Sequence, residues 1–128
     1  MREIKFRGYN EFEKRWVYGY GLHQSIFIDG SSNAYVTASI REVFIVDKES
    51  AGQYTGIKDK NGVEIYEGDI VETTRGLNHI IGAVIYRKAS WYIQSKEGYN
   101  VRLISIFSTA ENKIIGNVYE NKELLEVK

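Results

Sequence analysis

The stretch from residue 53 to 71, QYTGIKDKNGVEIYEGDIV, constrains the fold more tightly than any other part of the chain. Asn61-Gly62 predicts a tight hairpin turn of type I′, because Asn followed by Gly best tolerates a positive φ at both central residues. Residues 63–65 alternate between apolar and charged, as expected for a strand with one buried face. Gly68-Asp69 then interrupts the run and predicts a second tight turn, in which the Asp side chain accepts backbone N–H groups.

Short runs rich in β-branched and aromatic residues predict strands along the rest of the chain. The sequence contains no proline, so Gly, Asn, Asp and Ser must form the turns. No stretch has sustained helical periodicity, and we expect only short helical turns, at residues 47–51 with Asp47 as cap and after Asn121. The predicted strands are residues 5–9, 16–22, 25–28, 35–39, 43–46, 53–55, 63–65, 70–74, 80–87, 91–95, 99–104 and 113–119, with a further turn at 108–112.

Several strand positions carry specific expectations. Two-residue alternation predicts that Phe6, Trp16, Tyr18 and Tyr20 share one face. Glycines inside strands, at residues 19, 21 and 82, predict bulges, bends or close approaches of the backbone. The continuous apolar run at residues 43–46 predicts a strand that is buried on both faces.

Composition excludes several classes of protein. Lys plus Arg and Asp plus Glu both number 17, so the zero formal net charge gives no support for nonspecific binding to nucleic acid or to an anionic membrane. The absence of cysteine excludes a disulfide scaffold and thiol catalysis, and it fits a reducing cytoplasm. No apolar run approaches the ~20 residues that a membrane-spanning helix needs. We therefore expect a cytoplasmic protein with no membrane partner.

The residues that carry catalysis or bind metal ions form no convincing set. His23 and His79 are isolated in the sequence, and no nucleophile, base and orienting group occur together. A calcium loop around Asp59 fails, because Ile57 stands where the first acidic ligand is required. Two interpretations exist for the acidic residues Glu64, Glu67, Asp69 and Glu72. They could bind a divalent ion, or they face solvent at the edge of a sheet, which is the more common role of such charges. We expect no enzyme activity, no catalytic residue, no metal site and no cofactor.

Charge is segregated along the second half of the chain. Residues 73–102 contain five Lys or Arg and one Glu, whereas residues 51–72 contain five acidic residues and two Lys. Cations beside aromatic rings suit single-stranded nucleic acid, which needs paired phosphates and stacked bases. Alternatively, the aromatic rings fill a core and the cations face solvent. The candidate nucleic-acid-binding residues are Arg75, Arg87, Lys88, Trp91, Tyr92, Lys96 and Arg102.

Three segments together resemble the YopX family of phage and prophage proteins. The central match runs from QYTG at residue 53 through DKNG at 59 to IYEGD at 65. IKFR at residue 4 with Trp16, and IGNVYEN at residue 115 with Leu124-Leu125, match the opening and the close of the family pattern. The resemblance implies a mainly β fold, with an N-terminal β region at residues 1–50 and a small SH3-like barrel at 51–128. It implies no catalytic residues.

Two functions follow as hypotheses. The first is a noncatalytic phage or prophage accessory protein of the host cytoplasm, which binds itself as a homo-oligomer or binds a host or phage protein. The acidic segment beside the basic one makes the surface self-complementary and favours this reading. The second is a small barrel that binds nucleic acid through the basic and aromatic segment at residues 73–102.

Overall fold

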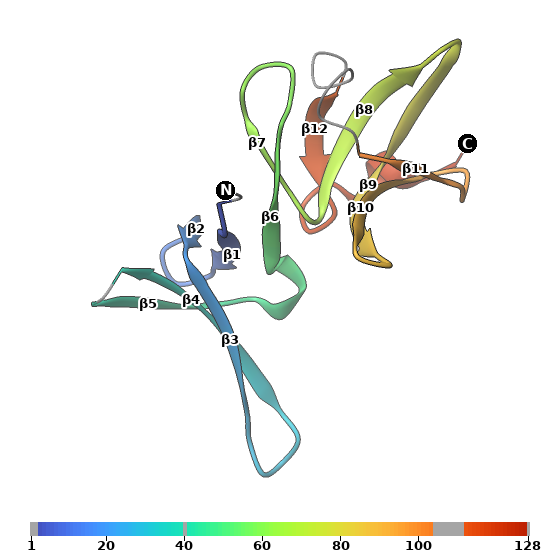
Figure 1. Ribbon diagram of the computed structural model, residues 1–128. Coiled ribbons are helices and arrows are strands. Elements are labelled where there is room, and N and C mark those ends of the chain that lie inside the picture. Colours follow the sequence, from blue (N-terminus) through green and yellow to red (C-terminus); the bar gives the residue numbers. More distant parts are fainter. Residues whose placement is uncertain (1–2, 40, 104–111, 128) are drawn as a thin grey trace. The chain divides into compact units, whose positions relative to one another are not determined.

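A computed structural model describes residues 3–39, 41–103 and 112–127 (Figure 1). In this part of the chain the protein is mainly β, with three antiparallel sheets and two short 3₁₀ turns. The prediction of a mainly β fold with only short helical turns is confirmed. The chain forms two compact units, residues 1–54 and 55–128. The predicted domains, residues 1–50 and 51–128, stay a prediction.

The first unit is built from two groups of strands. β1 and β2 form an antiparallel hairpin, and the start of β6 pairs with β1 through Gln53 opposite Phe6. The second group is a three-stranded meander in the order β3-β4-β5. The bounds are β1 (Phe6–Asn10), β2 (Arg15–Gly19), β3 (Gly21–Ile26), β4 (Ser32–Ser39), β5 (Glu42–Val46), the 3₁₀ turn η1 (Lys48–Ser50) and β6 (Gly52–Lys58).

The core of the first unit consists of Val17, Ala34, Val36 and Val46, with Phe44 packed against them. Tyr9 pairs with Trp16 on the opposite face of the β1–β2 hairpin, and their rings lie 5.7 Å apart. The predicted common face of Phe6, Trp16, Tyr18 and Tyr20 is therefore wrong. Phe6 pairs with Gly19 and so shares the face of Val17, because directly paired residues point the same way. Tyr20 lies between β2 and β3, outside both strands.

Close backbone packing explains the break after β2. A Cβ atom on Gly19 would lie 2.1 Å from the carbonyl oxygen of Thr37, so only glycine fits there. The carbonyl of Thr37 also accepts the N–H of Tyr20. The close approach of the backbone that the sequence predicts at Gly19 is confirmed. The predicted burial of β5 on both faces is wrong, since Val43 is 55% exposed on a strand at the edge of its sheet.

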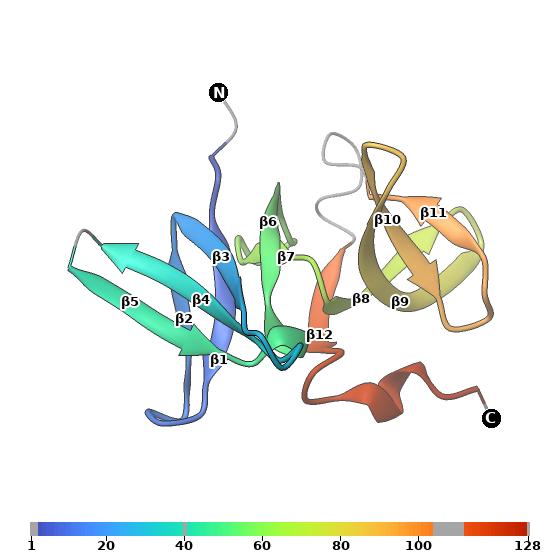
Figure 2. The ribbon, with the colours of Figure 1, turned by 90° about the horizontal axis from the view of Figure 1, so that it is seen from below.

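The second unit contains a five-stranded antiparallel sheet in the order β11-β10-β9-β8-β12. The sheet curls into a half-barrel, which is clearest in Figure 2. β6 and β7 are neighbours in the four-stranded sheet, whose strand order is β2-β1-β6-β7. The bounds are β7 (Glu64–Tyr66), β8 (Asp69–Arg75), β9 (Asn78–Arg87), β10 (Ser90–Ser95), β11 (Asn100–Arg102), β12 (Lys113–Asn117) and the 3₁₀ turn η2 (Lys122–Leu125).

The core of the second unit lies against one face of this sheet. It comprises Ile65, Val71, Ile80, Val84, Trp91, Ile93 and Leu103. Gly82 lies in the middle of β9, where an added Cβ would stand 2.3 Å from the carbonyl oxygen of Gln94 on β10. The close approach that the sequence predicts at Gly82 is thus confirmed.

The hairpin between β6 and β7 forms where it is predicted, but with another turn. Gly62 N–H donates to the carbonyl of Asp59, and Asp59 N–H donates to that of Val63, which closes a loop of residues 60–62. Only Gly62 has a positive φ in this loop, at 82°. The loop is therefore a type I turn followed by a left-handed glycine, and the predicted type I′ turn is wrong.

Side chains complete the two predicted turns around Asp59 and Asp69. Asp59 is buried, and its carboxylate accepts the N–H groups of Asn61 and Val63 at 2.8 and 3.0 Å. Its other oxygen accepts the N–H of Ile114 on β12 at 3.2 Å, so one carboxylate joins the loop to a distant strand. Asp69 accepts the N–H of Tyr66 at 2.7 Å, as the sequence predicts.

Both predicted helical turns are present as 3₁₀ turns. Asp47 and Asn121 occupy their N-cap positions, but neither side chain makes the capping hydrogen bond, so that detail is wrong. Asn121 Oδ1 instead accepts the N–H of Asn117. The predicted turn at residues 108–112 and the end of the strand at 99–104 fall largely outside the described residues.

Candidate functional site

The five-stranded sheet brings part of the predicted nucleic-acid surface together on the face opposite the core cluster. Tyr92 pairs with Arg102 on β11, and Ser90 pairs with Arg87 on β9. Because paired residues and alternate residues of a strand share a face, Arg87, Tyr92 and Arg102 point to the same side. This side is opposite to that of Trp91 and the core.

Hydrogen bonds hold the guanidinium groups of Arg102 and Arg75, two of the candidate residues, against the sheet. Arg102 Nη2 donates to Ser90 Oγ at 3.0 Å. Arg75 Nη2 donates to the carbonyl of Arg102 at 2.9 Å, and its Nη1 donates to Thr73 Oγ1 at 2.6 Å. Arg75 is thus tied to the end of β11.

The structure separates the remaining candidates. Trp91 is 9% exposed and packs in the core, so its ring is not available for stacking on a base. Tyr86, 4.8 Å from the Trp91 ring, is partly exposed beside it. Lys88 is exposed in the β9–β10 turn next to Arg87. Lys96 follows the other end of β10, about 20 Å from Ser90 at the rise of an extended strand.

The four acidic residues that the sequence singles out, Glu64, Glu67, Asp69 and Glu72, form no metal site in the described structure. Asp69 is buried in its turn, Glu64 accepts the hydroxyl of Tyr66, and Glu72 lies 3.1 Å from His79 Nε2. No group of three or more His, Asp or Glu in the described part of the chain has a geometry that could hold a metal ion. His23 stacks on Tyr35 at 5.0 Å in the first unit.

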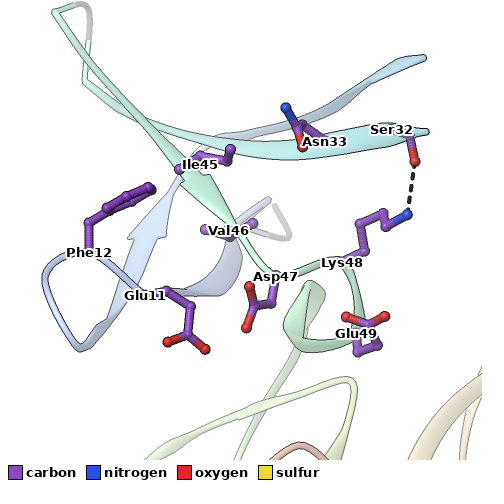
Figure 3. A pocket seen from close by; sticks show the side chains of 9 residues that line it. All are labelled: Glu11, Phe12, Ser32, Asn33, Ile45, Val46, Asp47, Lys48 and Glu49. Carbon is purple, nitrogen blue, oxygen red and sulfur yellow. Dashed lines mark hydrogen bonds between the residues drawn. The ribbon is translucent and has the colours of Figure 1, made fainter. Parts of the chain in front are cut away.

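A hollow of about 200 Å³ lies in the first unit, between the β1–β2 turn, the end of β5 and the start of η1 (Figure 3). Ile45, Val46 and Phe12 supply apolar surface, while Lys48 Nζ donates to Ser32 Oγ at 3.1 Å. Three carboxylates also line it, from Glu11, Asp47 and Glu49. The lining favours a small cationic group more than an anion.

The β3–β4 hairpin exposes a concentration of apolar side chains. Ile26 is 75% exposed, and Phe27 and Ile28 follow it at the hairpin tip with 47% and 109% exposed. The tip is an ordered turn, because Phe27 N–H donates to the carbonyl of Ser31, and Ser31 donates to Asp29 through both its N–H and its hydroxyl. These hydrogen bonds lower the pKa of Asp29, the bond from the Ser31 hydroxyl most strongly.

The three apolar side chains of Ile26, Phe27 and Ile28 are exposed to solvent in the described part of the chain. No helix among the described residues is long and apolar enough to cross a membrane.

Comparison with known proteins identifies the lineage. The model of the YopX protein family matches residues 5–126, nearly the whole chain. The chain belongs to the YopX family. The sequence-based resemblance to this family is thereby confirmed.

Two solved structures share the fold of this YopX family member. One is the crystal structure of YopX from Bacillus subtilis, with a TM-score of 0.56 and 20% identity over 100% of this chain and 99% of that one. The other is a protein from Enterococcus faecalis, with a TM-score of 0.52 and 23% identity over 98% of this chain and 100% of that one. No curated protein matches the sequence.

Sequence reasoning about this YopX protein missed the hairpin tip and the hollow. The run Ile26-Phe27-Ile28 was a usable signal, because three apolar residues in succession before the polar loop Asp29-Gly30-Ser31 cannot all face a core. The hollow gives no such signal, since its lining comes from three separated segments.

Proposed function

We propose that this YopX family protein is a noncatalytic phage or prophage accessory protein that works in the host cytoplasm by binding another protein chain. Its partner is a second copy of itself or a host or phage protein. The observation that supports this most strongly is the exposed apolar tip of the β3–β4 hairpin, Ile26 to Ile28. Exposed contiguous apolar surface typically marks a protein contact.

The tip is suited to binding because its shape is fixed before a partner arrives. Asp29 accepts the Ser31 N–H at 2.9 Å and the Ser31 hydroxyl at 2.6 Å. A turn that is already ordered loses less conformational entropy on association. The absence of catalytic residues and of a cofactor stays part of the proposal, and it rests on the lack of a nucleophile, base and orienting group in the sequence.

We also propose that the second unit is a small SH3-like barrel. Its support is the antiparallel order β11-β10-β9-β8-β12, joined by short turns and curled into a half-barrel (Figure 2). Such a barrel acts as a rigid platform and by itself indicates no particular ligand.

A capture experiment tests the proposal. Tagged protein is incubated with host lysate, treated or untreated with nuclease, and with a differently tagged second copy. We expect a protein partner, which survives nuclease and is lost in Ile28→Asp, because a charge at the tip opposes burial. The matched control Val63→Asp changes an exposed apolar residue in the second unit and keeps binding. Failure to capture any protein, the second copy included, contradicts the proposal.

Nucleic-acid binding is the second candidate, supported by the common face of Arg87, Tyr92 and Arg102. It predicts affinity for single-stranded oligonucleotides that falls steeply with salt. Fluorescence anisotropy at low salt measures it, and Arg87→Glu with Lys88→Glu removes it. The control Trp91→Phe keeps binding, since that ring is buried. No anisotropy change at micromolar protein excludes this candidate.

A further inference from the structure

We infer that β3 is a dimerisation strand, which pairs antiparallel with β3 of a second copy about a two-fold axis at Gln24. The inference rests on the proposed function and names the surface and the partner. β3 lies at an edge of its sheet and pairs only with β4 in the described structure. Its other side therefore presents backbone groups that can accept another strand.

Charge favours β3 over every other edge. The edge strands of the described sheets are β2, β7, β11, β12, β5 and β3. Each except β3 carries a charged residue of the kind that blocks edge pairing; these are Arg15, Glu64, Arg102, Lys113 and Glu42. β3, with the sequence GLHQSI, has no Asp, Glu, Lys or Arg, and its six residues make it the longest of these edges. A neutral strand meets its own copy without the like-charge repulsion that a two-fold axis imposes on a charged one.

The hydrogen-bond pattern determines the register. Phe27 N–H donates to the Ser31 carbonyl across the hairpin. In an antiparallel pair every second residue bonds to the same neighbour, so the backbone N–H and C=O groups of Ser25 and His23 also point toward β4. The N–H and C=O groups of Leu22, Gln24 and Ile26 consequently point to the free edge. A two-fold axis at Gln24 pairs Gln24 with its own copy and Leu22 with Ile26 of the second copy. Every outward group of the strand then finds a partner.

Side chains agree with this register. Leu22, Gln24 and Ile26 lie on the same face of the sheet as Ala34 and Val36. Ala34 and Val36 belong to the buried core of the first unit, but the side chains of β3 do not. A hollow of about 410 Å³ lies there, lined by Leu22, Gln24 and Ala34 among others. Ile26 of the second copy, opposite Leu22, would enter this hollow and bury its exposed side chain. On the other face His23 would stand opposite Ser25, so that no two like charges meet.

Charged substitutions of Gln24, the residue at the two-fold axis, test the inference. Gln24→Glu and Gln24→Lys each place like charges opposite one another, and we expect each to weaken self-association about tenfold or more. Mixing the two variants restores a dimer, because opposite charges then meet at the axis. The control Glu42→Lys, on the β5 edge of the same sheet, leaves association unchanged. Circular dichroism verifies that every variant is folded.

Cross-linking gives an independent readout, since the natural chain has no cysteine. In the inferred register Gln24→Cys places two Cα atoms about 5.5 Å apart, within reach of a disulfide, whereas Ser25→Cys places them diagonally and too far apart. We expect a cross-linked dimer only for Gln24→Cys. A wild type that associates with no effect of Gln24→Glu or Gln24→Lys refutes the inference and leaves the proposed function standing. A wild type that never associates with itself refutes the inference, and lysate capture then decides the proposed function.

Discussion

Asp59 is the residue whose removal tests the described packing most sharply. Its buried carboxylate accepts N–H groups from Asn61 and Val63 within the hairpin loop and from Ile114 on β12. Asp59→Ala removes both acceptor oxygens, so three hydrogen bonds are lost and the three N–H groups can only bond to water. The loop and the last strand of the half-barrel therefore lose their common attachment.

The expected cost follows from the individual hydrogen bonds. A bond to a charged acceptor contributes about 1.5–3 kcal/mol, and less where the donor can turn to solvent. Asn61 and Val63 are exposed residues, so their N–H groups recover part of the loss, whereas the bond to Ile114 joins separate elements. We expect Asp59→Ala to lower the free energy of unfolding by about 3–4 kcal/mol in total. At an m-value of about 2 kcal/mol/M, the urea midpoint falls by about 1.5–2 M.

Urea titration followed by Trp91 fluorescence measures this change in the second unit. A Trp16→Phe background removes the other tryptophan, which lies in the first unit. Asp59→Asn keeps the oxygen that serves the loop but turns an amide toward Ile114, so an intermediate loss is expected. The matched control is Glu97→Ala, which removes an exposed turn carboxylate in the same unit and should move the midpoint far less. Equal shifts for Asp59→Ala and Glu97→Ala would refute the reasoning.

Three further predictions concern single turns and strands. Lys88 and Ala89 both have positive φ, 49° and 62°, so replacing them with Asn-Gly should stabilise the fold by about 1–2 kcal/mol in urea titration; an unchanged midpoint contradicts this. Gly82→Ala should destabilise by about 1–3 kcal/mol in the same assay, because its Cβ would overlap the Gln94 carbonyl; a neutral effect would show that the close approach is absent. The pKa of Asp29 should lie below 3.8 by NMR titration and rise in Ser31→Ala, which loses the hydroxyl bond. Since folding lowers this pKa, the carboxylate stabilises the turn above its unfolded pKa and that contribution disappears as pH falls through the folded pKa; an unchanged titration in Ser31→Ala rules this cause out.

Local sequence predicts where turns occur better than which turns they are. Asn61-Gly62 marks a hairpin, but Asp59 captures the loop N–H groups and selects a three-residue loop with only Gly62 left-handed. The two-residue loop with two positive φ values forms instead at Lys88-Ala89. Pairing of Arg87 with Ser90 imposes it, since cross-strand contacts along β9 and β10 outweigh the local preference of two residues.

Faces and edges of strands depend on register, which sequence alternation does not supply. Phe6 falls on the side of Val17 because it pairs with Gly19, and no pattern within β1 reveals that partner. Val43 is exposed because β5 is an edge strand, although its sequence is typical of a central one. The same limit applies to Trp91: its neighbours are basic, yet the pairing with Tyr86 turns its ring into the core.

The candidate binding surfaces could be predicted only in part from the sequence, because strand register and strand order were not known. The cations at residues 75–102 are evident in the sequence, but the common face of Arg87 and Arg102 depends on the pairing of β9, β10 and β11. The neutral character of β3 is equally evident, and it acquires meaning only once the strand is known to lie at an edge.

The molar mass of the untagged protein in solution tests the central structural claim, self-association through the β3 edge, most directly. Light scattering after size exclusion is recorded from low micromolar to near-millimolar protein, at low and at moderate salt. The account predicts a mass that rises with concentration from 14.7 kDa toward twice that value and persists in salt, because the β3 edge is uncharged. A mass that stays at 14.7 kDa throughout would contradict it.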